Sequence, residues 1–118
     1  MQDLNENLPV EMDLEAFIEE TGLDREEYLE IYELFKETYE TLMKDLEEAL
    51  ARGDNFAAMR AAHTLKGAAS NLGFTALAEA ARRIQESPED TAGTAETLTE
   101  IRTLYASLDR QVRAFAVR

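Results

Sequence analysis

The chain has 118 residues, enough for one domain with a buried core, and its lack of cysteine excludes disulfides and thiolate metal sites. Its net charge of −13 argues against nucleic acid and anionic membrane surfaces as partners, because both are bound by positive charge. The sequence has no apolar run near the ~20 residues of a membrane span, and its acidic N-terminus is unlike a signal peptide, so we expect a cytoplasmic protein.

An extended lead-in and a short helix are the first expected elements. Residues 1–12 show no helical periodicity and include Pro9, which favours a mostly extended segment. Asp13 is placed to cap a short accessory helix that ends at Gly22. The apolar face of this helix is predicted to hold Leu14, Phe17 and Ile18.

A long amphipathic helix is expected next. Asp24 and Glu27 have the spacing of a capping box, and Gly53 marks the far end of the helix. Apolar residues at steps of three and four positions predict its buried face. These residues are Tyr28, Ile31, Phe35, Tyr39, Leu42, Leu46 and Ala49.

Three further helices are predicted in the second half of the chain. Asp54 can cap a third helix that stops at Gly73, and Thr75 can begin a fourth that stops before Pro88. Residues 87–94 are polar and contain a glycine, so a loop is expected there. The predicted inward residues are Leu77, Ala80, Ala81 and Ile84 in the fourth helix, and Leu98, Ile101, Tyr105, Leu108, Val112 and Phe115 in the last.

Four amphipathic helices joined by short connections favour an all-α fold. We expect an antiparallel four-helix bundle with a short accessory N-terminal helix. The helices that start at Asp24 and Asp54 are separated by only a few residues and should form an antiparallel hairpin. Residues 13–118 are predicted to form this single domain, as a monomer, because the bundle can bury its own apolar faces.

The third helix carries the only histidine of the chain, within the stretch AAHTLKGAASNLG at residues 61–73. At about 100° of rotation per residue, its alanine-rich side is centred on Leu65, and His63 lies on the opposite, solvent-exposed side. The inward side is predicted to hold Ala57, Ala58, Ala61, Ala62, Leu65, Ala68, Ala69 and Leu72. The outward side should hold Phe56, Met59, Arg60, His63, Lys66, Gly67, Ser70 and Asn71.

The neighbours of His63 favour a reactive role over an inert surface position. Lys66 places an ammonium one turn from the imidazole, and Gly67 removes a side chain that would crowd the ring. That glycine costs about 1 kcal/mol of helix stability relative to alanine. Phe56 and Met59 add apolar surface to a face that is otherwise polar. A neutral imidazole can attack phosphorus through its free ring nitrogen, so the face offers a nucleophile, a cation and a contact surface for a partner.

The segment AHTLKGAASNLG closely resembles the signature of histidine-containing phosphotransfer (HPt) domains of two-component phosphorelays. That signature is a histidine, two residues, Lys-Gly, a small residue, and a Leu-Gly pair that closes the helix. The matching positions are His63, Lys66, Gly67, Ala68, Leu72 and Gly73. The resemblance covers roughly residues 54–86, and the rest of the chain matches in size and helical pattern.

The resemblance implies that His63 takes a phosphoryl group on Nε2 from the aspartyl phosphate of a response-regulator receiver domain, alone or in a hybrid sensor kinase, and passes it to another receiver. Lys66 would contact the phosphoryl group, and Gly67 would let the receiver's loop approach. The chain would need no cofactor, because the Mg²⁺ of the transfer belongs to the receiver. Helical geometry places Phe56, Met59, Arg60, Ser70 and Asn71 in the surrounding docking surface.

Two alternatives stay open at this point. The chain could be the N-terminal phosphotransfer module of a chemotaxis-type histidine kinase, or a docking bundle in which His63 is inert and the Phe56/Met59 face binds a protein non-covalently. No autonomous kinase activity is expected, because the sequence has no glycine-rich nucleotide loop. No metal site is expected either, because a carboxylate site in a bundle needs a Glu-x-x-His pair and Arg60 stands three positions before His63.

Overall fold

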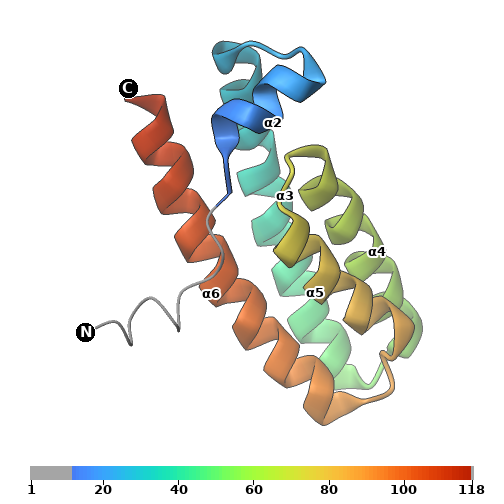
Figure 1. Ribbon diagram of the computed structural model, residues 1–118. Coiled ribbons are helices and arrows are strands. Elements are labelled where there is room, and N and C mark those ends of the chain that lie inside the picture. Colours follow the sequence, from blue (N-terminus) through green and yellow to red (C-terminus); the bar gives the residue numbers. More distant parts are fainter. Residues whose placement is uncertain (1–11, 118) are drawn as a thin grey trace.

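A computed structural model describes residues 12–117, which form five helices and no strands (Figure 1). The helices are α2 (Leu14–Thr21), α3 (Arg25–Arg52), α4 (Asn55–Asn71), α5 (Thr75–Glu86) and α6 (Thr91–Ala116). The predicted extended lead-in falls almost wholly on residues 1–11, which lie outside the described residues; Met12 precedes α2 without helical structure.

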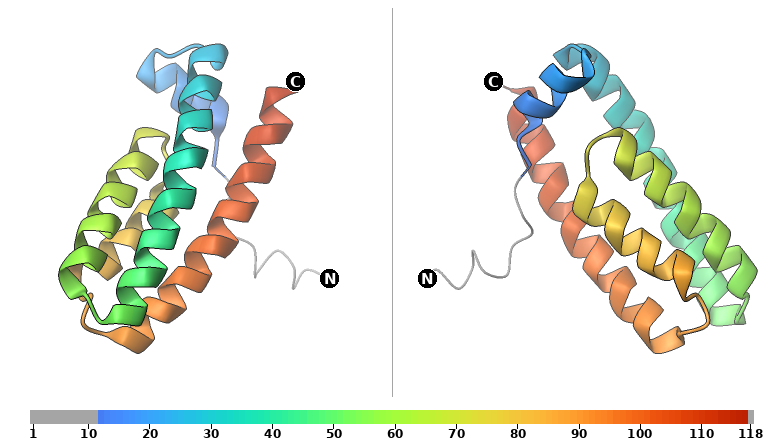
Figure 2. Two further views of the ribbon diagram at one scale, coloured as in Figure 1. Left: turned by 180° about the vertical axis from the view of Figure 1, so that it is seen from behind. Right: turned by 45° about the vertical axis from the view of Figure 1, so that its right-hand side comes forward.

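Helices α3 to α6 form an antiparallel bundle, which confirms the predicted all-α fold. Helix α3 packs on α4 and α6, and α5 packs on the same two helices from the other side (Figures 1 and 2). The short helix α2 covers the end of the bundle at which α4 turns into α5. No helix among residues 12–117 is long and apolar enough to cross a membrane.

Side-chain caps start α2, α3 and α4 at the positions that the sequence predicts. The Asp13 carboxylate accepts a hydrogen bond of 3.0 Å from the Ala16 amide at the start of α2. Asp24 and Glu27 form a complete capping box at the start of α3, with bonds of 2.8 and 3.0 Å. Each cap satisfies amide groups that have no partner within the helix, which explains why these local sequence signals locate the helix starts correctly.

The predicted loop over residues 87–94 is half as long in the structure: residues 87–90 connect α5 to α6, whereas 91–94 are helical because α6 already begins at Thr91. The Asp90 carboxylate caps α6 by accepting a hydrogen bond of 3.0 Å from the Gly93 amide. A Cβ on Gly93 would overlap that carboxylate, so glycine serves the cap here and does not break the helix. Thr94, which was expected in the loop, is buried.

The core follows the predicted faces with small differences. All the predicted inward residues of α5 are buried, and so are those of α3 and α6 except Ile31 and Tyr105, which are half-buried. Tyr32 and Met43, which the periodicity did not single out, are buried as well. Aromatic rings from α3, the α4–α5 turn and α6 pack together in the middle of the bundle, through contacts of Phe35 with Tyr32, Tyr39, Phe74 and Tyr105.

The turn from α4 to α5 is held from two sides. Gly73 adopts a left-handed φ of +77°, which L side chains rarely adopt, and a Cβ there would lie 2.6 Å from the Phe17 ring of α2. From α3, the Tyr28 hydroxyl donates a hydrogen bond of 2.8 Å to the Leu72 carbonyl. These contacts fix where α4 ends and so set its position against α5.

Candidate functional site

Helix α4 turns its alanine-rich side to the core and leaves His63 exposed on the opposite side, as predicted. Ala58, Ala61, Ala62, Leu65, Ala69 and Leu72 are buried, while Ala57 and Ala68 are half-buried at the edges of that side. The Asp54 carboxylate caps the helix by accepting a hydrogen bond of 3.0 Å from the Ala57 amide. His63 therefore lies midway along a helix that is capped at one end and held by Gly73 at the other.

Gly67 and Lys66 lie one turn from His63 and differ in exposure. Gly67 is exposed, and a Cβ added to it would meet no atom within 4 Å, so the backbone here has open space above it. Lys66 was predicted to be exposed and is half-buried. Arg60 and Thr64 border the groove between α3 and α4, so Lys66, on the other edge of α4, lies on the side that packs against α5.

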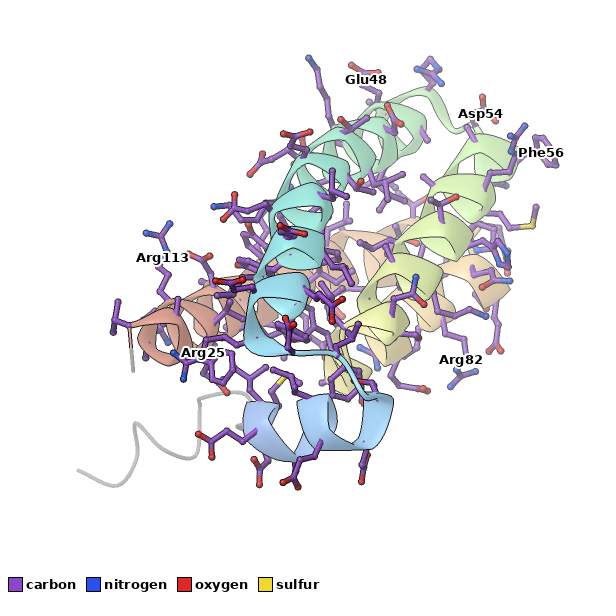
Figure 3. All side chains as sticks on the ribbon, turned by 90° about the horizontal axis from the view of Figure 1, so that it is seen from above. Arg25, Glu48, Asp54, Phe56, Arg82 and Arg113 are labelled. Carbon is purple, nitrogen blue, oxygen red and sulfur yellow. The ribbon has the colours of Figure 1, made fainter. Side chains whose placement is uncertain are left out.

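Apolar and cationic groups gather toward the start of α4. Phe56 is 63% exposed, which is unusual for a phenylalanine, and the Arg60 guanidinium lies 5.7 Å from the centre of its ring. Both residues border a groove of about 350 Å³ between α3 and α4, whose α3 wall includes Asp45 and Glu48. In Figure 3, the side chain of Phe56 projects from the bundle near the end at which Glu48 lies.

The remaining predicted docking residues also lie on α4. Arg60, Ser70 and Asn71 are exposed as predicted, whereas Met59 is half-buried. Met59 stands two turns before Lys66 on the same edge of the helix. The two residues that are less exposed than predicted therefore lie on one side of α4. The predicted outward residues thus share one continuous face around His63.

A charged row on α5 was not singled out from the sequence. The Nε atom of Arg82 donates to Glu79 over 2.9 Å and its Nη1 atom donates to Glu86 over 2.6 Å, so one guanidinium bridges two carboxylates of the same helix. The hydrogen bond from Arg82, followed by weaker effects of the charges on Arg82, Arg83 and Lys66, lowers the pKa of Glu79. The spacing Glu-x-x-Arg-x-x-x-Glu could have predicted these ion pairs within α5, although it does not show which neighbouring helix the charged residues face.

Comparison with protein families gives one match, a family model described as the Hpt domain, over residues 30–111. The matched range extends from α3 into α6 and includes all of α4 and α5. Comparison with curated proteins and with solved structures finds no match. The family match therefore covers most of α3 and α6, all of α4 and α5, and the whole of the face around His63.

Proposed function

The chain belongs to the Hpt domain family, and we propose that it carries a phosphoryl group on His63 between receiver domains of a two-component phosphorelay. Membership of this family implies phosphotransfer in two-component signalling, and Hpt domains are phosphocarrier modules that interact with receiver domains and kinases. One observation carries the assignment to His63. It is the single histidine of the chain, it lies within the matched range, and it is exposed on the outer face of α4.

The proposed transfer is a displacement at phosphorus. The lone pair on Nε2 of His63 forms the new N–P bond as the O–P bond of the receiver's aspartyl phosphate breaks, and the aspartate leaves as a carboxylate. Transfer onward is the same step in reverse with a second receiver. The receiver brings the Mg²⁺ that neutralises charge on the phosphoryl oxygens.

Lys66 and Gly67 have separate proposed roles beside the imidazole. Lys66, one turn along the helix, would donate to the phosphoryl oxygens, and as a partly exposed ion pair this adds about 0.2–1 kcal/mol. Its larger contribution would come in the transfer complex, where the partner excludes water. Gly67 has open space above its backbone, which supports a role in admitting the receiver's active-site loop.

We assign the receiver contact to the face made by Phe56, Met59, Arg60, Ser70 and Asn71 around His63. Exposed apolar groups on an otherwise polar face are typical of protein contacts, and aromatic and arginine side chains are enriched in them. The exposed Phe56 ring with Arg60 against it supplies both types of group.

Incubation with a phosphorylated receiver domain and Mg²⁺ tests the proposal. We expect an acid-labile, alkali-stable phosphoryl group on the wild-type chain and none on His63→Gln. Arg110→Gln, an exposed change on α6, is a control that should label normally. Label that persists in His63→Gln would exclude His63 as the acceptor, and an unlabelled wild type with several receivers would favour the inert docking bundle.

A further inference from the structure

Helix α5 presents a second cation at the level of His63. The antiparallel helices α4 and α5 are joined across Asn71 and Thr75, and each advances about 1.5 Å per residue. His63 stands eight residues before the end of α4, and Arg83 stands eight residues after the start of α5. Residues 82 and 83 of α5 therefore lie beside the His63 level of α4.

The two arginines at this level point to different neighbours. Arg83 donates a hydrogen bond of 2.5 Å to Glu100, which fixes it on the edge of α5 that faces α6. Arg82, about 100° further round the helix, belongs to the row with Glu79 and Glu86. Because Arg83 marks the edge next to α6, Arg82 lies toward the other edge of α5, which packs on α4, while Glu79 and Glu86 are exposed on the outer side of the helix. In Figure 3, Arg82 projects on the same side of the molecule as Phe56, opposite Arg113 of α6.

We propose that Arg82 is a second phosphoryl-binding residue, which turns from its carboxylate partners to the phosphoryl oxygens once His63 is phosphorylated. This inference rests on the proposed function of His63. Glu79 and Glu86 act as positioning residues, because their hydrogen bonds hold the Arg82 guanidinium extended along the surface of α5.

Charge balance supports such an exchange. In the unphosphorylated protein, the Arg82 guanidinium is bound by the two carboxylates Glu79 and Glu86. A phosphoryl group adds about two negative charges to the same surface. A guanidinium matches phosphoryl oxygens through two parallel N–H bonds, a geometry that a lysine ammonium lacks. Arg82 would thus supply directional binding where Lys66 supplies a point charge.

Phosphorylation by potassium phosphoramidate, a small donor, tests Arg82 without any receiver. The Nε2 lone pair of His63 forms the N–P bond as the P–N bond of phosphoramidate breaks and ammonia leaves. We expect Arg82→Gln to lower the initial rate about three- to fivefold, the range of a partly exposed ion pair, and Arg82→Lys to recover part of that loss. Arg83→Gln is the matched control, because it removes the same charge one residue away on the α6 edge, and it should leave the rate within error of wild type.

The side-chain NMR signal of Arg82 gives a second readout. The Nε–Hε resonance of Arg82 should shift when His63 is phosphorylated, while that of Arg83 should stay in place, and neither should move in His63→Gln treated with phosphoramidate. Circular dichroism before labelling checks that each variant is folded.

The outcomes separate the two proposals. Equal rates for Arg82→Gln and Arg83→Gln, with an unmoved Arg82 signal and normal labelling of His63, would overturn the role of Arg82 alone. A wild-type chain that takes no phosphoryl group from phosphoramidate or from a phosphorylated receiver would overturn the proposed function and this inference together.

Discussion

The hydroxyl of Tyr28 donates a buried hydrogen bond of 2.8 Å to the carbonyl oxygen of Leu72, and this bond ties the first turn of α3 to the end of α4. Tyr28→Phe removes the hydroxyl donor and leaves the buried Leu72 carbonyl without this hydrogen bond. We expect the free energy of unfolding to fall by about 1–2 kcal/mol, measured by urea denaturation. Tyr39→Phe, at a buried ring that stacks on Tyr105, is the control and should cost less. Equal losses in the two variants would contradict a special role for the Tyr28 bond.

The two glycines of the HPt-like segment should respond to alanine in opposite directions. Gly67 is helical with open space above it, so Gly67→Ala should raise the free energy of unfolding by up to about 1 kcal/mol. Gly73 has a φ of +77° and the Phe17 ring beside it, so Gly73→Ala should lower the same quantity by more than about 1 kcal/mol. Denaturation of both variants under one set of conditions checks the signs, and a stabilised Gly73→Ala would contradict the contact between α2 and the turn.

Alkaline pH should unfold the protein as its tyrosines ionise. Burial raises the pKa of all four tyrosines, Tyr28, Tyr32, Tyr39 and Tyr105, and that of Tyr39 to about 12. A phenol with a raised pKa stabilises the fold fully below its unfolded pKa, about 10, and this contribution is lost as pH rises through the folded pKa. Tyrosinate absorbance should therefore rise at higher pH in buffer than in urea, together with the loss of helical circular dichroism. Ionisation of all four near pH 10 with the helices intact would contradict this prediction.

The helix starts could be predicted from sequence because each depends on contacts within a few residues. Asp13, Asp24 and Asp54 each cap the amide three positions ahead, so short spacings contain the information. The prediction failed at Gly93, because a glycine usually indicates a loop. The sequence alone does not show that the Asp90 carboxylate occupies the space that a Cβ at this position would need.

The candidate site was only partly predictable for a related reason. Helical periodicity within α4 was enough to predict that His63 is exposed, since this prediction requires no knowledge of the neighbouring helices. Lys66 is predicted to be exposed but is half-buried, on the edge of α4 next to α5. Arg82 was not identified, because its place beside His63 depends on the register between α4 and α5, which the turn at Gly73 sets.

Gly67→Leu should slow phosphotransfer severely while the fold stays intact. The added side chain fills the open space next to His63 and blocks the approach of a receiver loop, whereas leucine is itself a good helix former. The measurement is the single-turnover rate of transfer from a phosphorylated receiver. Labelling by phosphoramidate is the control, because this small donor needs less clearance and should lose much less rate. Transfer from the receiver at the wild-type rate would show that clearance at Gly67 is irrelevant.

Phe56 and Leu34 offer a matched test of the docking face, because both are large apolar side chains with similar exposure, 63% and 66%. Phe56 lies on α4 with His63, whereas Leu34 lies on α3 outside the proposed contact. Phe56→Ala should weaken receiver binding by about 1 kcal/mol or more, as expected for an aromatic contact residue, and raise the dissociation constant at least about fivefold. Leu34→Ala should leave binding unchanged.

Both variants should keep the wild-type free energy of unfolding to within about 0.5 kcal/mol, because neither side chain is buried. Calorimetric titration of each variant with an unphosphorylated receiver domain measures the two dissociation constants directly. If Leu34→Ala weakened binding as much as Phe56→Ala, the receiver would not be confined to the α4 face. If only Leu34→Ala weakened it, the receiver would dock on α3, and the exposure of Phe56 beside Arg60 would need another explanation.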